Sequence, residues 1–145
     1  TVFISLDPAF SKFNDTITKE LGRTLTHEVH HVLRWKIGYG ETLIEALITE
    51  GLADHFDVEI NNEDPEPWCI ALNDNQLKEL LTKAQEEFTN RSYDHNSWFF
   101  GSKEKRIPRW TGYSLGYKLV NDYLQKNPDK KPSNIYALKA EEFIK

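Results

Sequence analysis

The chain has 145 residues, a length that suits a single domain with its own hydrophobic core. Hydrophobic residues make up 39% of the chain, a share that excludes intrinsic disorder. The net charge is −5 and there is no block of Lys or Arg, which disfavours binding to nucleic acid. The apolar runs are too short for a membrane span, and the single cysteine, Cys69, excludes a disulfide within the chain, which favours a cytoplasmic location.

Hydrophobic periodicity predicts a mainly helical chain. The first six residues, T-V-F-I-S-L, favour a short edge strand that Asp7-Pro8 ends. Apolar residues three and four apart then predict helices over residues 14–37, 41–59, 73–90 and 113–125, and a last short helix after Pro132. Because the chain starts at Thr1 and contains no methionine, we expect residues 1–145 to be one domain that is truncated at its N-terminal side.

Residues 27–31, H-E-V-H-H, match the pattern H-E-x-x-H inside the first predicted helix. His27 and His31 are four residues apart and therefore share a helix face, from which both can reach one zinc ion. Glu28 lies on the flank of that face, where it can act as a general base on a water bound by the metal. His30 points away from Glu28, so we expect it in a supporting or surface position rather than as a ligand.

The same helix should bury its opposite side. An apolar arc lies across the helix from the two histidines, and we expect it to face the core. It contains Leu21, Leu25, Val29, Val32 and Leu33.

A catalytic zinc ion takes three protein ligands, and Glu50 is the candidate for the third. It follows His31 after eighteen intervening residues, on the next predicted helix. Asp54 is four residues further along the same face, where it could accept a hydrogen bond from the non-ligating nitrogen of His27. Glu45 and His55 are alternative ligands on other faces of that helix.

Three segments resemble those of a known family. H-E-V-H-H followed by E-G-L-A-D looks like the gluzincin metallopeptidases, whose H-E-x-x-H is followed by a glutamate ligand. More narrowly, the segments L-G-R-T-L-T-H-E-V-H-H, L-I-T-E-G-L-A-D-H-F and W-T-G-Y-S-L-G-Y-K-L-V resemble a bacterial family of predicted zinc-dependent proteases. The resemblance implies an α+β, zincin-like domain that holds one zinc ion and hydrolyses a peptide or protein substrate.

Hydrolysis of an amide passes through an oxyanion, for which a donor besides the metal is expected. Tyr113-Ser114-Leu115-Gly116 is similar to the Tyr-x-Lys-Gly arrangement of gluzincin aminopeptidases, although Leu115 replaces the lysine. The resemblance implies Tyr113 as the stabilising group, with Tyr117 and then Tyr39 as alternatives. Tyr113 and Tyr117, four residues apart, could equally be a packed aromatic pair.

Other features leave alternatives open. The aromatic residues Trp98, Phe99, Phe100 and Trp110 suit either a substrate pocket or the core. Arg109 could bind a substrate carboxylate or lie at the surface, and His95 has no partner at ligand spacing. The same pattern would also fit a zinc hydrolase of a non-peptide amide, a zinc-bearing module without turnover, or a helical domain without metal.

Overall fold

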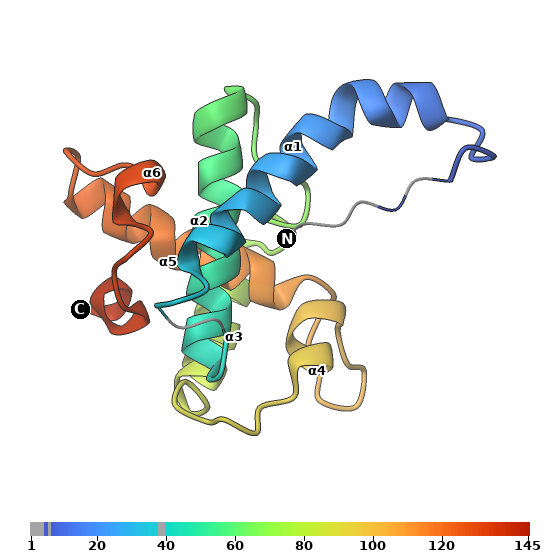
Figure 1. The fold of residues 1–145 in the computed structure, drawn as a ribbon. Coiled ribbons are helices and arrows are strands. Elements are labelled where there is room, and N and C mark those ends of the chain that lie inside the picture. The colour runs from blue at the N-terminus through green and yellow to red at the C-terminus, as the bar shows by residue number, and fades with distance from the viewer. Residues whose placement is uncertain (1–4, 6, 38–39) are drawn as a thin grey trace.

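The computed structural model describes residues 5, 7–37 and 40–145. The helices, shown in Figure 1, are α1 (Phe13–Arg34), α2 (Leu43–Asn61), α3 (Asp74–Gln85), α4 (His95–Phe100), α5 (Thr111–Lys126) and α6 (Pro132–Ile135), followed by a 3-10 helix, η1 (Ala140–Ile144). This confirms the prediction of a mainly helical chain. Within the described ranges there is no strand, only one antiparallel bridge between Ser102 and Ile107.

The predicted edge strand over residues 1–6 falls on positions that are not described, except Ser5, which is not in a strand. Within the described ranges no helix is long and apolar enough to cross a membrane.

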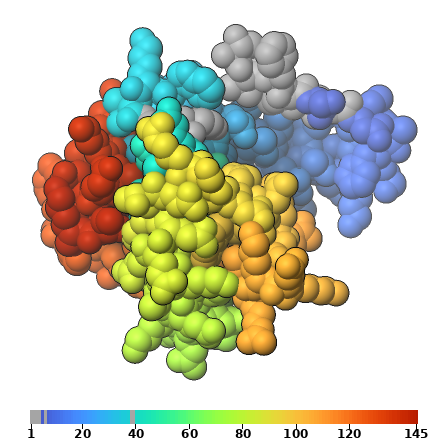
Figure 2. All heavy atoms as spheres, turned by 90° about the horizontal axis from the view of Figure 1, so that it is seen from below, coloured from blue at the N-terminus to red at the C-terminus, as the bar shows by residue number. Residues whose placement is uncertain are grey.

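The helix α2 is the centre of the fold. It packs against α1 on one side and α5 on the other (Figure 1). Because it is covered from both sides, α2 is buried along most of its length, and Leu43, Leu47, Ile48 and Leu52 have no exposed surface. Figure 2 shows the segments from α3 to the start of α5 covering another face, while the first turns of α1 project beyond the rest of the molecule.

The helices α2 and α5 cross at two glycines. A Cβ atom placed on Gly51 would lie 2.3 Å from the carbonyl oxygen of Gly116, and one placed on Gly116 would lie 2.1 Å from the carbonyl oxygen of Leu47. Contacts this short leave no room for a side chain, so the crossing brings backbone against backbone. The close crossing places α5 against Gly51, the residue that follows Glu50.

The predicted core face of α1 is wrong. Leu25, Val29, Val32 and Leu33 are 37–52% exposed, whereas His30, His31 and Arg34 are buried. Periodicity identified the apolar arc, but in the described chain α2 packs against the opposite, polar arc of α1. That arc carries the side chains of the candidate site. An apolar stripe of α1 therefore lies on the surface.

The surface position that was one of the two expectations for His30 is wrong. His30 is fully buried, with its ring 5.2 Å from that of Phe56. Burial, together with the nearby charge of Arg34, lowers the pKa of His30 to about 3, so the imidazole is neutral in the core.

The last turn of α1 is tied to the C-terminal segment by Arg34. Its buried guanidinium donates hydrogen bonds to the carbonyl oxygens of Tyr136 and Leu138, at 2.8 and 2.9 Å, and to the hydroxyl of Thr49 on α2 at 3.3 Å. These bonds satisfy a charge that would be expensive to bury alone. The end of the helix that carries the histidines is thereby held against α2.

Candidate active site

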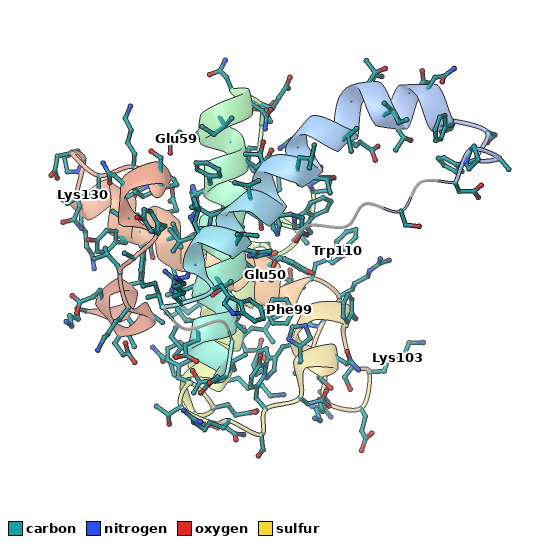
Figure 3. The ribbon with its side chains drawn as sticks, viewed as in Figure 1. Glu50, Glu59, Phe99, Lys103, Trp110 and Lys130 are labelled. Carbon is teal, nitrogen blue, oxygen red and sulfur yellow. The ribbon has the colours of Figure 1, made fainter. Side chains whose placement is uncertain are left out.

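Glu50 of α2 lies where α1 crosses α2 (Figure 3), and two histidines of α1 face its carboxylate. Nε2 of His27 lies 3.3 Å from Oε2 of Glu50, and Nε2 of His31 lies 3.5 Å from Oε1 of the same side chain. Two ligands of a tetrahedral zinc ion, each about 2.1 Å from the metal, are roughly 3.4 Å apart. The distances from Glu50 to His27 and to His31 are therefore close to those between two ligands of one zinc ion.

Asp54 lies on the other side of the His27 ring. Its Oδ1 is 3.0 Å from Nδ1 of His27, and the same oxygen accepts a hydrogen bond from Nε1 of Trp68 at 3.2 Å. A carboxylate on Nδ1 fixes the ring and leaves Nε2 to face Glu50. Asp54 thus lies at hydrogen-bonding distance from the His27 ring, and Trp68 adds a donor that the sequence pattern did not reveal.

The ionisable side chains of the cluster shift one another's pKa values strongly. Burial alone would lower the pKa of His27, but the carboxylates of Asp54 and Glu50 outweigh this effect and raise it to about 10. Burial would likewise raise the pKa of Glu50, yet hydrogen bonds from His27 and His31 lower it to about 2. Two carboxylates therefore stabilise positive charge at His27, a setting that suits a divalent cation in place of a proton.

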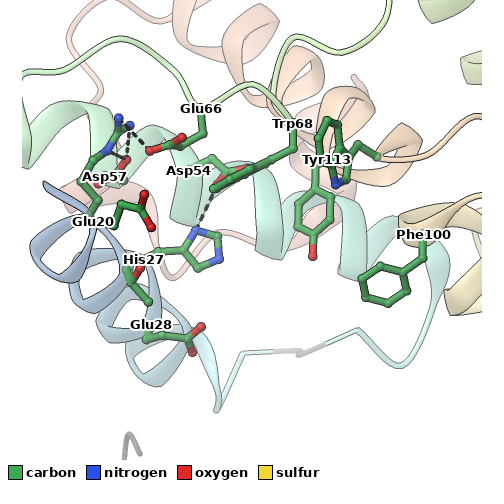
Figure 4. A pocket seen from close by; sticks show the side chains of 12 residues that line it. Glu20, His27, Glu28, Asp54, Asp57, Glu66, Trp68, Phe100 and Tyr113 are labelled. Carbon is green, nitrogen blue, oxygen red and sulfur yellow. Dashed lines mark hydrogen bonds and ion pairs between the residues drawn. The ribbon is translucent and has the colours of Figure 1, made fainter. Parts of the chain in front are cut away.

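Glu28 offers a second way of completing a metal cluster. Its carboxylate and the ring nitrogens of His27 and His31 supply atoms that all lie within 4.8 Å of one another. Glu50, however, is the carboxylate that contacts Nε2 of both histidines, whereas Glu28 lines the adjoining cleft beside His27 (Figure 4). The two carboxylates thus lie on different sides of the histidine pair, Glu50 against both Nε2 atoms and Glu28 at the cleft.

The cleft has a volume of about 410 Å³ and is built by several elements (Figure 4). Its lining comes from α1, α2, the loop between α2 and α3, and the ends of α4 and α5; the residues are Glu20, Arg23, Thr24, His27, Glu28, Asp54, Asp57, Glu66, Trp68, Phe100, Trp110 and Tyr113. Helix α1 thus carries the two candidate histidine ligands and part of the adjoining cleft wall.

Tyr113 belongs to this cleft, and its ring packs edge-on against that of Phe99 at 5.0 Å. Burial first, and then the charges of Glu50, Asp54 and Glu28, raise the pKa of Tyr113 well above its ordinary value. The hydroxyl therefore stays protonated at neutral pH and can donate a hydrogen bond into the cleft.

Of the two alternatives to Tyr113, Tyr117 is turned to other contacts. Tyr117 stacks on His55, with ring centroids 3.8 Å apart and planes 5° from parallel. Tyr39 is outside the described residues. The four-residue spacing of Tyr113 and Tyr117 therefore does not make them a packed pair, since Tyr113 packs on Phe99 and Tyr117 on His55.

The rival ligands are engaged in other contacts. Glu45 forms the capping box of α2, accepting a hydrogen bond from the backbone N–H of Thr42 at 3.0 Å. Nε2 of His55 lies 3.0 Å from the carbonyl oxygen of Tyr117. His95 stacks on Phe99 at 4.4 Å between ring centroids.

The aromatic segment divides between core and cleft. Trp98 and Phe99 are 1% and 0% exposed, whereas Phe100 and Trp110 line the cleft. Arg109 lies over the ring of Trp110, with Cζ 4.5 Å from the ring centroid. Residues 98–110 therefore contribute both to the hydrophobic core and to the cleft wall.

Sequence reasoning missed Arg23, which joins three parts of the structure. Its guanidinium donates to Asp57 of α2 at 2.8 Å and lies 2.8 Å from Glu66 of the following loop. Arg23 is four residues before His27, so helical periodicity alone could have placed it on the same face. Its partners, in contrast, are more than thirty residues away and required the tertiary structure.

Comparison with known proteins gives one match. A family model described as "Predicted Zn-dependent protease (DUF2268)" matches residues 4–145. The comparison with curated proteins gave no match, and neither did the comparison with solved structures.

Proposed function

The chain belongs to the family of predicted Zn-dependent proteases, and on this premise we propose that it is a zinc-dependent peptidase of the gluzincin type. His27, His31 and Glu50 would hold one zinc ion. The observation that carries the proposal is the position of Glu50, whose two oxygens lie 3.3 and 3.5 Å from Nε2 of the two histidines. A solvated helix glutamate would have no reason to lie between two imidazoles.

Each residue has a separate part in the proposed reaction. A zinc ion would supply a Lewis acid that polarises the substrate carbonyl and acidifies a water molecule. Glu28 takes the proton of the attacking water and passes it to the leaving amine. Tyr113 donates its hydroxyl to the oxyanion, and Asp54 holds the His27 ring through Nδ1.

Metal stoichiometry tests the ligand set. Metal-stripped protein reloaded with zinc should retain one equivalent after gel filtration, and Glu50→Gln should weaken binding strongly because it removes a charged ligand. Glu45→Gln is the matched control, since it makes the same change on the same helix at a residue engaged in the capping box. Equal zinc affinity of the Glu50→Gln and wild-type proteins would remove Glu50 from the site.

Hydrolysis tests the role of Glu28. Zinc-loaded wild type should cleave a mixed peptide digest, while Glu28→Gln should keep its zinc and lose about 10²–10⁴-fold in rate, the usual contribution of a general base. Zinc retention without any cleavage by the wild type would instead favour a zinc-bearing binding module. Cleavage of small non-peptide amides alone would favour the other hydrolase.

A further inference from the structure

The cleft beside the candidate metal ligands has two unlike ends (Figure 4). One end, which we call the aromatic end, is formed by Trp68, Phe100, Trp110 and Tyr113. The other, the charged end, is formed by Glu20, Arg23, Asp57 and Glu66. His27 and Glu28 lie between them, so the two ends flank the residues proposed to carry out hydrolysis.

Phe100 is exposed where its neighbours are not. It is the last residue of the short helix α4, in which Trp98 and Phe99 are buried, and yet 57% of its surface is accessible. A large apolar ring on a cleft wall, next to other aromatic rings, is typical of a surface that binds apolar groups.

Trp110 is held in an unusual backbone conformation. Its φ of 68° and ψ of 12° are left-handed, which is rare for a bulky residue. Its N–H donates to the carbonyl oxygen of Phe99 at 3.1 Å, and its own carbonyl accepts from Ser114 at 3.0 Å as α5 begins. Unfavourable backbone geometry that the surrounding contacts maintain is commonest at ligand-binding walls.

The charged end does not offer a cation to the substrate. Nε and Nη1 of Arg23 contact Asp57 and Glu66, and Nη2 donates to the carbonyl oxygen of Asp64 at 2.9 Å. Among the described residues that line the cleft, five are carboxylates and Arg23 is the only Lys or Arg. The cleft therefore repels acidic side chains.

We infer that the aromatic end binds a bulky apolar side chain of a residue that flanks the scissile bond, and that acidic residues at the same position are rejected. This inference deepens the proposed peptidase function and rests on it. Phe100 and Trp110 are the specificity-determining residues, because they contribute apolar surface without contacting the candidate metal ligands.

Three matched peptides test the inference. They share an acetylated, amidated alanine heptapeptide in which the central residue is Phe, Ala or Asp, and cleavage positions are read by mass spectrometry. The zinc-loaded protein should cut beside Phe with a kcat/KM about tenfold or more above that for the Ala peptide, a ratio that one well-packed apolar group supports. The Asp peptide should be the poorest.

Phe100→Ala should lower the ratio of kcat/KM for the Phe peptide to kcat/KM for the Ala peptide about tenfold. Phe10→Ala is the matched control, because it removes a ring that is 50% exposed and lies outside the cleft; it should leave both values unchanged. Phe100→Leu, which retains an apolar side chain, should restore part of the preference. Equal turnover of the Phe and Ala peptides, or a preference that survives Phe100→Ala, overturns the inference.

A binding measurement separates this inference from the proposed function. If the wild type cuts no peptide, turnover fails, but calorimetry on the zinc-loaded protein still decides whether the aromatic end recognises apolar residues. Binding of the Phe peptide about tenfold tighter than the Asp peptide, lost in Phe100→Ala, supports the recognition. Equal binding of the two peptides rejects it.

Discussion

Replacing Gly51 by alanine adds one methyl group at the crossing of α2 and α5. The new Cβ would lie 2.3 Å from the carbonyl carbon and oxygen of Gly116 and 2.9 Å from the backbone nitrogen of Tyr117. Ordinary carbon–oxygen contacts are about 3.3 Å or longer, so the helices must separate by roughly 1 Å. No side-chain rotation can relieve the clash, because every one of these neighbours is backbone.

The expected loss of stability follows from that separation. Overpacking in a filled core costs about 1–3 kcal/mol, and a clash against rigid backbone belongs at the upper end. A loss of about 3 kcal/mol would lower Tm by roughly 6–12 °C in a chain of this size. Because α5 carries Tyr113, the same 1 Å shift moves its hydroxyl relative to Glu50, and misplacement on that scale can reduce hydrolysis about a hundredfold.

Gly22→Ala is the control, since it makes the same chemical change in the interior of α1. There the nearest atom to the added Cβ is the side-chain oxygen of Asn61, at 3.9 Å. Alanine should stabilise an exposed helix position by about 0.5–1 kcal/mol relative to glycine. Replacing glycine by alanine is thus expected to lower stability at Gly51 and to raise it at Gly22.

Urea unfolding followed by circular dichroism measures both variants, with equal m-values as the check that the free energies are comparable. The double variant Gly51→Ala/Gly116→Ala should lose less than the two single losses combined, because one separation of the helices accommodates both methyl groups. If Gly51→Ala remained within about 0.5 kcal/mol of wild type, the close crossing of α2 and α5 would be wrong.

Four further outcomes are expected, three at the candidate site and one at the buried cysteine. Because the pKa of His27 is raised to about 10, the metal-free protein should lose stability as pH rises from about 6.5 to about 10. For the same reason zinc must displace its proton near neutral pH, so calorimetry in buffers of different ionisation enthalpy should report about one proton released per zinc; no release contradicts this assignment. Trp68→Phe keeps an aromatic side chain but removes the N–H donor to Asp54, and should weaken zinc binding about tenfold in a chelator competition; unchanged affinity would show that the bond has no bearing on the metal. Cys69 is buried, which raises the pKa of its thiol, so iodoacetamide should label it far more slowly in native than in urea-unfolded protein; comparable rates would place the thiol at the surface.

Much of this arrangement could be predicted because it is encoded locally. The spacing of His27, His31, Glu50 and Asp54 along two helices is enough to indicate which side chains share a face, and the structure brings these four together. The helix boundaries were close for the same reason, since periodicity is strong in a chain with long amphipathic segments.

The remainder depended on which faces meet. Periodicity identified the apolar arc of α1 correctly but could not tell that α2 covers the opposite, polar arc. Trp68 and Arg23 act through partners distant in sequence, and no local pattern pairs Arg23 with Glu66 or Trp68 with Asp54. Contacts of this kind are decided by tertiary packing.

The residues of the candidate site come from two parts of the chain that are far apart in sequence. All the proposed metal-side residues lie between His27 and Asp54, on two consecutive helices, whereas Trp110 and Tyr113 reach the cleft from α5. Contacts between neighbouring helices close small loops and form early, while distant ones must wait for larger loop closures. If the proposed function holds, a newly made chain would bind zinc before the aromatic end of the cleft is in place, and metal loading and substrate recognition would mature as separate steps.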